Sequence, residues 1–482
     1  MANDNSRRKV VLFIPNTRWY DKRPWMQVPY VAAILTALLR DAVDLSVIDA
    51  NVENLSMEQG LQRLKDARPE MVLLSGLSVE YHEQYRKALE LAKQANPDCI
   101  TIFGGIFPTL MPDEAMQDVN VDYIMIGRAE GRLPELIDMI FAGDKDRLRA
   151  FGGIGYRNEN GDAVINRHAG FHRQVVKPDF SLLDVRGYVT YKSQDFLSNS
   201  AHGANANIMT STGCPLSCSF CASRTVTSGK VLFRPVEDVI EEFEFYINEH
   251  GVRNFTIVDE NFLANRKRVE AILNTIIERD YDIVWQMGNV ALWHLDDELL
   301  ELMKRAGCTA ISPSIESGDP YVLKELIGKP LKILEKAPEV IAKCKELDIT
   351  VAAHFVIGLP DETWEQIRRT FSYAESLDAD LVVFHIATPY PKTALYEQAK
   401  ARGLLPESFS FFSPEFYGTT RGFITTEEFT PFELMVMRSF EWDRINFKTP
   451  EKTAKVARMM NFSLEELDNH RRQTRVKCGV HY

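Results

Sequence analysis

Short apolar runs alternate with amphipathic segments from residue 9 to residue 127. The runs are rich in β-branched residues and continuously apolar, as in strands that are buried on both faces. The segments between them carry apolar residues at helical spacing. This alternation predicts a doubly wound, Rossmann-like α/β domain with a parallel sheet between two layers of helices. The expected strands cover residues 9–15, 45–49, 71–76, 99–105 and 123–127, and the expected helices cover 29–40, 57–67 and 83–95.

Glycines occur at the expected carboxyl ends of three of these strands. They are Gly76, the pair Gly104 and Gly105, and Gly127. Ligands of doubly wound sheets bind beyond the carboxyl ends of the strands, and glycine lets a flat cofactor approach the backbone closely. A tight turn explains paired glycines equally well, so both interpretations stay open.

Six further strand–helix units follow a less regular stretch, in which Asn160-Gly161 predicts a hairpin turn. Six units are too few to close an eight-stranded barrel, so an open, partial (β/α)6 barrel is expected, with its active face at the carboxyl ends of the strands. Its strands are expected at residues 206–211, 254–258, 283–287, 309–315, 350–357 and 381–387.

The pattern therefore predicts four regions. They are a Rossmann-like domain over 1–142, a linker with a hairpin over 143–200, the partial barrel over 201–405, and a small, mostly helical region with an aromatic flap over 406–482.

Composition narrows the function classes. The net charge of −12 argues against binding of nucleic acid, which usually requires a basic excess. No apolar run reaches the roughly 18 residues that a membrane span needs, so no membrane partner is expected. The seven cysteines, an odd number with four of them scattered singly, do not resemble a disulfide framework and favour a cytoplasmic location.

Three of the cysteines, Cys214, Cys218 and Cys221, lie in the segment STGCPLSCSFCASR. A buried helix stripe would fit their spacing, but Gly213 and Pro215 favour a loop. A structural zinc site usually has four protein ligands, and a redox pair of the last two thiols would leave the first unused. Three soft thiolates suit a four-iron cluster with one iron open to a chelating substrate.

The spacing Cys-x3-Cys-x2-Cys, with Phe220 before the last cysteine, resembles the signature of the radical S-adenosylmethionine (radical SAM) superfamily. The resemblance implies that the three cysteines ligate one 4Fe–4S cluster and that S-adenosylmethionine chelates the fourth iron. It implies reductive cleavage of S-adenosylmethionine to a 5′-deoxyadenosyl radical, which abstracts hydrogen from a small-molecule substrate. An external electron donor such as flavodoxin or ferredoxin is the implied partner.

Other segments resemble family positions at the active ends of the barrel strands: DENFLANRKR, SIESGDP, HFVIGLPDET and FHIATPYPKTALYEQ. Glu316 is the expected contact to S-adenosylmethionine. Helix capping explains Asp259 and Glu260 equally well, and His354 and His385 are more often satisfied core histidines than catalytic ones. The resemblance implies catalytic roles for Glu316, His354 and Tyr390, and cofactor contacts for Phe220, Asp259, Glu260, Glu316, Ser317 and Gly358.

The segments FGGIFPTLMPDEA and VDYIMIGRAEGRLPEL resemble the cobalamin-binding domain that precedes the barrel in one branch of this superfamily. The resemblance implies a corrin near Gly76, Gly104, Gly105 and Gly127. The chain departs from the branch at MQVPYVAAIL, which lacks the usual glycine, and at Arg128, and it has no Asp-x-His-x-x-Gly motif. It thus predicts cobalamin binding without a histidine ligand, or the fold retained without the cofactor.

Much of this branch methylates unactivated carbons with methylcobalamin and a substrate radical, which makes such a methyltransferase, acting on a secondary metabolite, the leading hypothesis. Cobalamin-independent dehydration or deoxygenation of a sugar diol, or oxidative cyclisation, is the alternative. A non-enzymatic iron–sulfur or cobalamin carrier would leave the barrel and the Glu316 segment without a use.

Overall fold

The computed structural model describes residues 7–168, 170, 172–191, 203–414, 416–417 and 420–479. The chain divides into two compact units near residue 189, with the short segment Val226–Ser228 grouped with the first unit. In the described ranges, no helix combines the length and the apolar character needed to cross a membrane.

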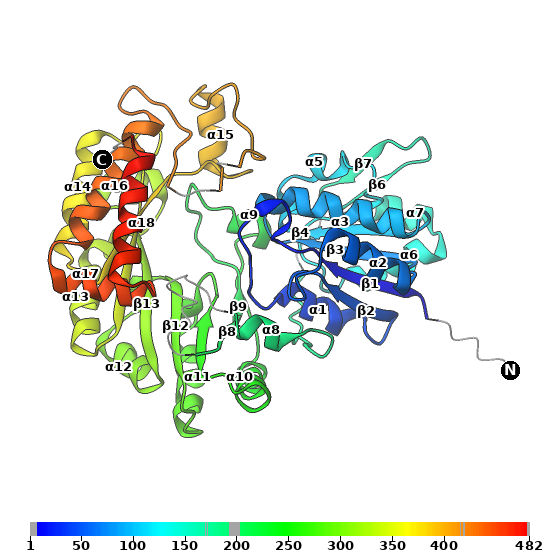
Figure 1. Ribbon diagram of the computed structural model, residues 1–482, viewed down its shortest axis with the longest axis horizontal. Helices are drawn as coiled ribbons and strands as arrows, with labels where there is room; N and C mark the ends of the chain where they lie inside the picture. Colours follow the sequence, from blue (N-terminus) through cyan, green and yellow to red (C-terminus); the bar gives the residue numbers. More distant parts are fainter. Residues whose placement is uncertain are drawn as a thin grey trace. The chain divides into compact units, whose positions relative to one another are not determined.

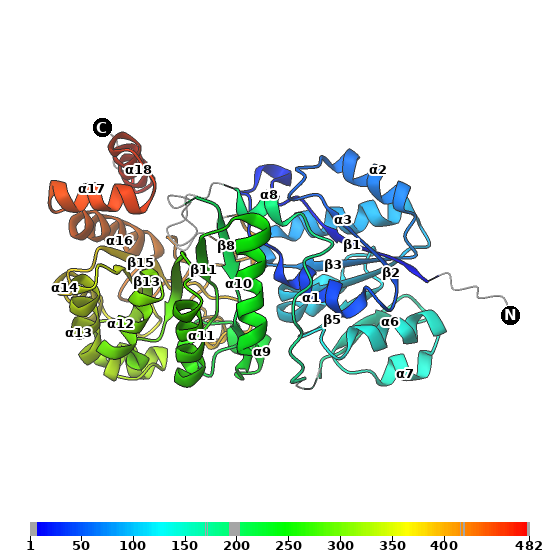
Figure 2. The ribbon, with the colours of Figure 1, turned by 90° about the horizontal axis from the view of Figure 1, so that it is seen from below.

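The first unit is built on a seven-stranded sheet (Figure 1). Its parallel strands lie in the order β2-β1-β3-β4-β5, so the direction of winding reverses between β1 and β3. Figure 2 shows α2 and α3 on one face of the sheet and α1, α6 and α7 on the other. The predicted doubly wound domain is therefore confirmed. Its elements are β1 (Lys9–Ile14), α1 (Tyr30–Leu39), β2 (Asp44–Asp49), α2 (Met57–Ala67), β3 (Met71–Gly76), α3 (His82–Ala95), β4 (Ile100–Gly105), α4 (Ile106–Leu110), α5 (Pro112–Met116), β5 (Tyr123–Met125), α6 (Leu133–Ala142), α7 (Lys145–Ala150), β6 (Ile154–Arg157), β7 (Ala163–Asn166) and α8 (Val185–Val189).

Alternate strand residues build the core beneath α1 and α6. Val10 and Leu12 of β1 join Met71 and Leu73 of β3 in one buried cluster with the apolar faces of these two helices. Side chains two residues apart point to the same face of a strand, and each fully buried aliphatic side chain contributes about 1.5–3 kcal/mol. These strands are buried on both faces of the sheet, and their sequences are therefore continuously apolar.

The predicted hairpin forms, but it belongs to this sheet rather than to a separate linker. Gly161 has the positive φ of +84° that the turn requires. β6 pairs antiparallel with β5, Met125 lying opposite Ile154, and β7 pairs with β6. Strand pairing therefore extends the first unit well beyond the expected boundary at residue 142. The end of the expected linker, residues 192–200, lies outside the described residues.

The second unit contains a six-stranded parallel sheet whose strands follow chain order, β8-β11-β12-β13-β14-β15. Long amphipathic helices connect these strands (Figure 2). The predicted partial barrel is confirmed. Its elements are β8 (Asn205–Ile208), β9 (Ser211–Thr212), α9 (Ser223–Thr227), β10 (Leu232–Phe233), α10 (Val236–His250), β11 (Asn254–Ile257), α11 (Arg266–Glu278), β12 (Val284–Val290), α12 (Asp297–Arg305), β13 (Cys308–Glu316), a π-helix (Val322–Ile327), α13 (Lys332–Glu346), β14 (Thr350–Ile357), α14 (Trp364–Ser376), β15 (Leu381–Ile386), α15 (Ala394–Ala401), α16 (Pro431–Asn446), α17 (Pro450–Met459) and α18 (Leu464–Lys477).

The C-terminal helices protect the edge strand β15. The Asn446 side chain, from α16, accepts a hydrogen bond from the Val382 N–H at 2.8 Å and donates one to the Val382 carbonyl at 2.9 Å. Arg438 Nε donates to the Phe384 carbonyl at 2.9 Å. These side chains take the place of a neighbouring strand, which an exposed sheet edge would otherwise recruit.

Candidate active site

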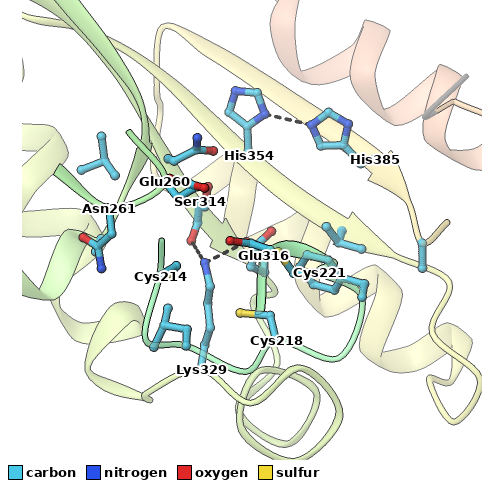
Figure 3. A pocket seen from close by; sticks show the side chains of 18 of the residues that line it. Cys214, Cys218, Cys221, Glu260, Asn261, Ser314, Glu316, Lys329, His354 and His385 are labelled. Carbon is cyan, nitrogen blue, oxygen red and sulfur yellow. Dashed lines mark hydrogen bonds and ion pairs between the residues drawn. The ribbon is translucent and has the colours of Figure 1, made fainter. Parts of the chain in front are cut away.

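A cavity of about 380 Å³ lies at the carboxyl end of the second unit's sheet (Figure 3). Every one of the six strands contributes to it, either from its last residues or from the loop that follows. This is the face on which barrel enzymes carry their chemistry. Of the predicted site residues, the structure brings together Cys214, Cys218, Phe220, Cys221, Glu260, Glu316, His354 and Tyr390 in its lining.

The cysteines lie on an irregular loop after β9, as Gly213 and Pro215 suggested, and not on a helix. Gly213, with a φ of +96°, donates its N–H to the Glu260 carboxylate at 2.9 Å. Further along, the backbone of Ser219 donates to the Ile327 carbonyl at 3.1 Å and accepts from the Leu395 N–H at 2.9 Å. The barrel therefore holds the backbone of the loop at Gly213 and at Ser219.

The donor set fits an iron–sulfur cluster. Within the described part of the chain, no three His, Cys, Asp or Glu side chains converge closely enough to hold a single metal ion. A 4Fe–4S cluster takes thiolate ligands on its separate iron atoms, so its cysteines need not meet at one point. Burial raises the pKa of the Cys218 thiol to about 12, and burial also raises the pKa of Cys221. Iron must therefore displace a proton from these thiols as it binds.

Glu316 is the last residue of β13, and its backbone adopts the left-handed conformation, with a φ of +73°. Its Oε1 accepts a hydrogen bond at 2.8 Å from the Lys329 ammonium, which also donates to the Ser314 carbonyl at 2.8 Å (Figure 3). Both charged side chains are buried. Gly328 ends the π-helix with a φ of +88° and turns the chain so that Lys329 points back toward β13. The result is a buried ion pair beside the cysteine loop.

Lys329, which lies 13 residues beyond Glu316, was not predicted from the sequence. Its only sequence signal is a position between Gly328 and Pro330 in a loop after a barrel strand. That pattern is typical of many solvent-exposed turns. The pairing depends on the π-helix and on the fold of β13, neither of which residue spacing reveals.

Three other predicted cofactor contacts lie outside the cavity lining. Asp259 is fully buried, and its carboxylate accepts hydrogen bonds from the N–H and hydroxyl of Thr210 and from the Ser211 hydroxyl. Burial raises the pKa of Asp259. The structure thus gives this residue a role in holding the strand that leads to the cysteine loop, rather than in contacting a cofactor.

Ser317 and Gly358 likewise stabilise turns. The Ser317 hydroxyl lies 3.0 Å from that of Thr370 and accepts from the Asp319 N–H at 3.1 Å. Gly358 has a φ of +87°, and a Cβ there would lie 2.6 Å from the Leu434 side chain. Both positions are explained by the packing of the barrel.

His354 and His385 form a hydrogen-bonded pair in the cavity. Their rings are 10° from parallel, and His354 Nδ1 lies 2.9 Å from His385 Nε2 (Figure 3). Burial lowers the pKa of His354 to about 3, with a further contribution from the second imidazole, and burial lowers the pKa of His385. Both rings are therefore neutral near pH 7, and one of the two facing nitrogens donates while the other accepts.

This pair makes stability depend on pH. An unfolded histidine binds a proton as the pH falls through about 6.5, whereas folded His354 does so only near pH 3. The unfolded state thus binds more protons between these values, and the folded state loses stability as the pH falls. We expect the free energy of unfolding, measured in urea, to drop more from about pH 7 to about pH 5 in the wild type than in His354→Asn. Equal drops in the two proteins would contradict a neutral buried pair.

In the first unit, the glycines at the strand ends divide into two classes. A Cβ on Gly105 would lie 2.6 Å from the Gly76 carbonyl oxygen, and one on Gly76 would lie 3.0 Å from the Phe103 ring. The sheet itself requires these glycines. By contrast, a Cβ on Gly104 would meet nothing closer than 3.8 Å. Met125 would thus lie in ordinary van der Waals contact with such a Cβ, and the sheet does not require a glycine at this position.

A single threonine joins the neighbouring strand ends. The Thr109 hydroxyl donates to the Gly105 carbonyl at 2.6 Å and accepts from the Gly127 N–H at 2.9 Å. Gly127 itself has a φ of +79°. This bridge holds β4 and β5 at the edge where doubly wound sheets bind their ligands, so the strand end that carries Gly104 is held in place.

Comparison with known proteins agrees with this geometry. Residues 208–374, which carry the cysteine loop and Glu316, match the radical SAM superfamily. These residues form a radical SAM domain. Residues 26–137 match a B12 binding domain, so the chain carries that domain ahead of its barrel.

Relatives identify this protein as an enzyme. An uncharacterized methyltransferase of Pyrococcus horikoshii is 29% identical over 404 residues, covering 82% of this chain and 84% of that protein. The anaerobic magnesium-protoporphyrin IX monomethyl ester cyclase of Rubrivivax gelatinosus is 26% identical over 397 residues, which cover 80% of this chain and 68% of the cyclase. The fold is similar to that of the radical SAM methyltransferase TsrM from Kitasatospora setae, whose structure was solved with tryptophan and a SAM analogue bound. The two structures superpose with a TM-score of 0.70 over 93% of this chain and 90% of TsrM, at 19% sequence identity.

Proposed function

We propose that the protein is a cobalamin-dependent radical SAM methyltransferase that acts on an unactivated carbon of a small molecule. The observation that carries the proposal is the cavity in which three thiols of one loop lie beside the buried Glu316–Lys329 pair. The B12-binding domain and the methyltransferase relative support methyl transfer as the reaction. An external donor such as flavodoxin or ferredoxin is proposed as the source of electrons.

Cys214, Cys218 and Cys221 would hold the cluster, and the strand ends around Gly104 would receive the corrin. When bound, the cluster and S-adenosylmethionine supply a radical that abstracts hydrogen, and cobalamin supplies the methyl group. The protein's own residues then bind the reactants, orient them and exclude water.

Glu316 is placed to orient S-adenosylmethionine. In the described part of the chain, Lys329 bonds one carboxylate oxygen of Glu316, and no contact occupies the other. That second oxygen can accept a hydrogen bond from a ribose hydroxyl or from the amino group of the cosubstrate. Lys329 supplies the counter-charge to this carboxylate within the buried site.

The remaining walls control water and proton position. Phe220, Trp293, Val356 and Ile386 give the cavity apolar walls that keep water away from a reactive radical. The neutral pair of His354 and His385 offers one acceptor and one donor to a substrate hydroxyl or amide. The pair can therefore orient a substrate without adding charge to the cavity.

A test of the cobalamin assignment uses Gly104, a strand-end glycine that the sheet does not require. We expect the wild type, incubated with hydroxocobalamin and desalted, to retain about one corrin per chain by absorption. Gly104→Leu should lower the retained corrin at least about tenfold, because its side chain fills the space that the cofactor would use, while the fold tolerates an added Cβ.

The matched control is Gly161→Asn in the hairpin turn, where no atom lies within 4 Å of an added Cβ and where asparagine tolerates a positive φ. This variant should retain corrin like the wild type. If Gly104→Leu retained as much corrin as the wild type, the corrin would not bind at this strand end.

The similarity to the Rubrivivax cyclase favours oxidative cyclisation as a second candidate. It would use the same cavity and the same radical. In that case the product would carry no methyl group from S-adenosylmethionine.

A further inference from the structure

A second cavity, of about 400 Å³, lies among the C-terminal helices, outside both matched domains. Arg438 and Trp442 line it from α16, His470 and Lys477 line it from α18, and Arg421 lines it from the segment before α16. The size is within the range of small-molecule sites, roughly 300–1,000 Å³. The reaction proposed above uses none of these residues.

The lining is basic and contains no carboxylate. Among the described residues, no Asp or Glu forms an ion pair with Arg421, Arg438 or Lys477. The two acidic side chains that follow Arg438 on α16 are already paired, Glu441 with Arg444 and Asp443 with Arg471 and Arg475. Three positive side chains therefore face one cavity without a counter-charge from the described chain.

Arg438 is the least solvated of these cations. Its Nε is fixed by the Phe384 carbonyl, which leaves the terminal guanidinium nitrogens for another acceptor. Burial lowers the pKa of Arg438 to about 10, and only the Cys478 thiol acts against this shift. Burial lowers the pKa of His470 as well, and both Lys477 and Arg438 add to the effect. A half-buried charge without a partner is costly unless an anion neutralises it.

The rest of the lining suits a phosphorylated molecule. Thr420, Ser439 and Thr474 supply hydroxyl groups, and Trp442 and Met435 supply apolar surface. A phosphate dianion balances more of the three positive charges than a single carboxylate does, and arginine is well suited to bind phosphate. The cavity also has room for an organic group beyond the phosphate itself.

We propose that this cavity binds the phosphate group of a small molecule. The molecule is either the substrate of the barrel, held through a phosphate remote from the reacting carbon, or a separate effector. Strand β15 connects the two cavities. Arg438 of the second cavity donates a hydrogen bond to the carbonyl of Phe384 on this strand. The next residue on the strand, His385, lines the reaction cavity.

Equilibrium dialysis of the full chain against radiolabelled inorganic phosphate tests the proposal. We expect one phosphate per wild-type chain, and Arg421→Gln and Lys477→Gln should each weaken binding about tenfold, the loss of one charge-assisted hydrogen bond. Both positions are exposed, so neither change should unfold the protein. Arg472→Gln is the matched control, because it removes the same charge from α18, where Arg472 pairs with Asp468 instead.

Wild-type binding that is absent, or equal in all variants, would overturn the proposal. Two arms distinguish the source of the phosphate once turnover is measured. If inorganic phosphate raises only the KM of the barrel reaction for its substrate, the phosphate displaces a phosphorylated substrate from this cavity. Phosphate that changes kcat at constant KM would show a separate effector.

Discussion

Simultaneous replacement of Cys214, Cys218 and Cys221 by alanine is expected to abolish both the broad cluster absorption and the cleavage of S-adenosylmethionine. The three thiols lie on one loop whose backbone the barrel fixes at Gly213 and Ser219. No other described cysteine lines the cavity. Iron content, the visible spectrum after anaerobic reconstitution, and 5′-deoxyadenosine formation are the measurements.

Cys344→Ala is the control for this experiment. Cys344 is buried on α13 and is outside the cavity lining. Loss of its thiol removes some packing, typically on the order of 1 kcal/mol, and should leave cluster and cleavage intact. A triple variant that kept its iron and its activity would show that the cluster does not depend on this loop.

The second large effect concerns the buried ion pair. Lys329→Met should lower the free energy of unfolding by about 3–5 kcal/mol, because it leaves the Glu316 carboxylate buried without a counter-ion. The double variant Glu316→Gln, Lys329→Met removes both charges and should recover most of that loss. Urea unfolding of the four proteins of the cycle gives the coupling energy.

Binding of S-adenosylmethionine separates the role of Glu316 from stability. Glu316→Gln and the double variant should keep the cluster but bind the cosubstrate at least about tenfold more weakly, the cost of one hydrogen bond to a charged acceptor. Lys336→Met is the control, because Lys336 pairs with Glu339 at the surface and such pairs contribute about 0–1 kcal/mol. Unchanged affinity in the double variant would limit Glu316 to a structural role.

The sequence predicted the parts of this structure that depend on local pattern. Both sheets followed from apolar runs such as Val10–Phe13, since buried parallel strands are continuously apolar. The cysteine loop followed from thiol spacing and from the flanking Gly213 and Pro215. The hairpin at Gly161 was also predicted, but its assignment to the first sheet depends on pairing with β5, which a turn signal does not contain.

The roles of individual site residues were less predictable, because they depend on contacts between distant segments. Asp259 and Glu260 are neighbours in sequence, yet Asp259 holds Thr210 and Ser211 while Glu260 lines the cavity and holds Gly213. Both acids follow a barrel strand, and only the register of β11 against β8 decides which way each one points. The approach of Lys329 to Glu316 likewise depends on tertiary structure.

The most direct test of the proposed reaction follows the methyl group. The reconstituted enzyme is incubated under reducing, anaerobic conditions with a small-molecule extract of the producing cells and with S-adenosylmethionine carrying a heavy-isotope methyl label. The assay is run with and without hydroxocobalamin, and products are analysed by mass spectrometry. For a cobalamin-dependent methyltransferase, we expect a labelled product that requires cobalamin and is absent with the triple cysteine variant. An unlabelled, dehydrated or cyclised product formed equally well without cobalamin would contradict this assignment.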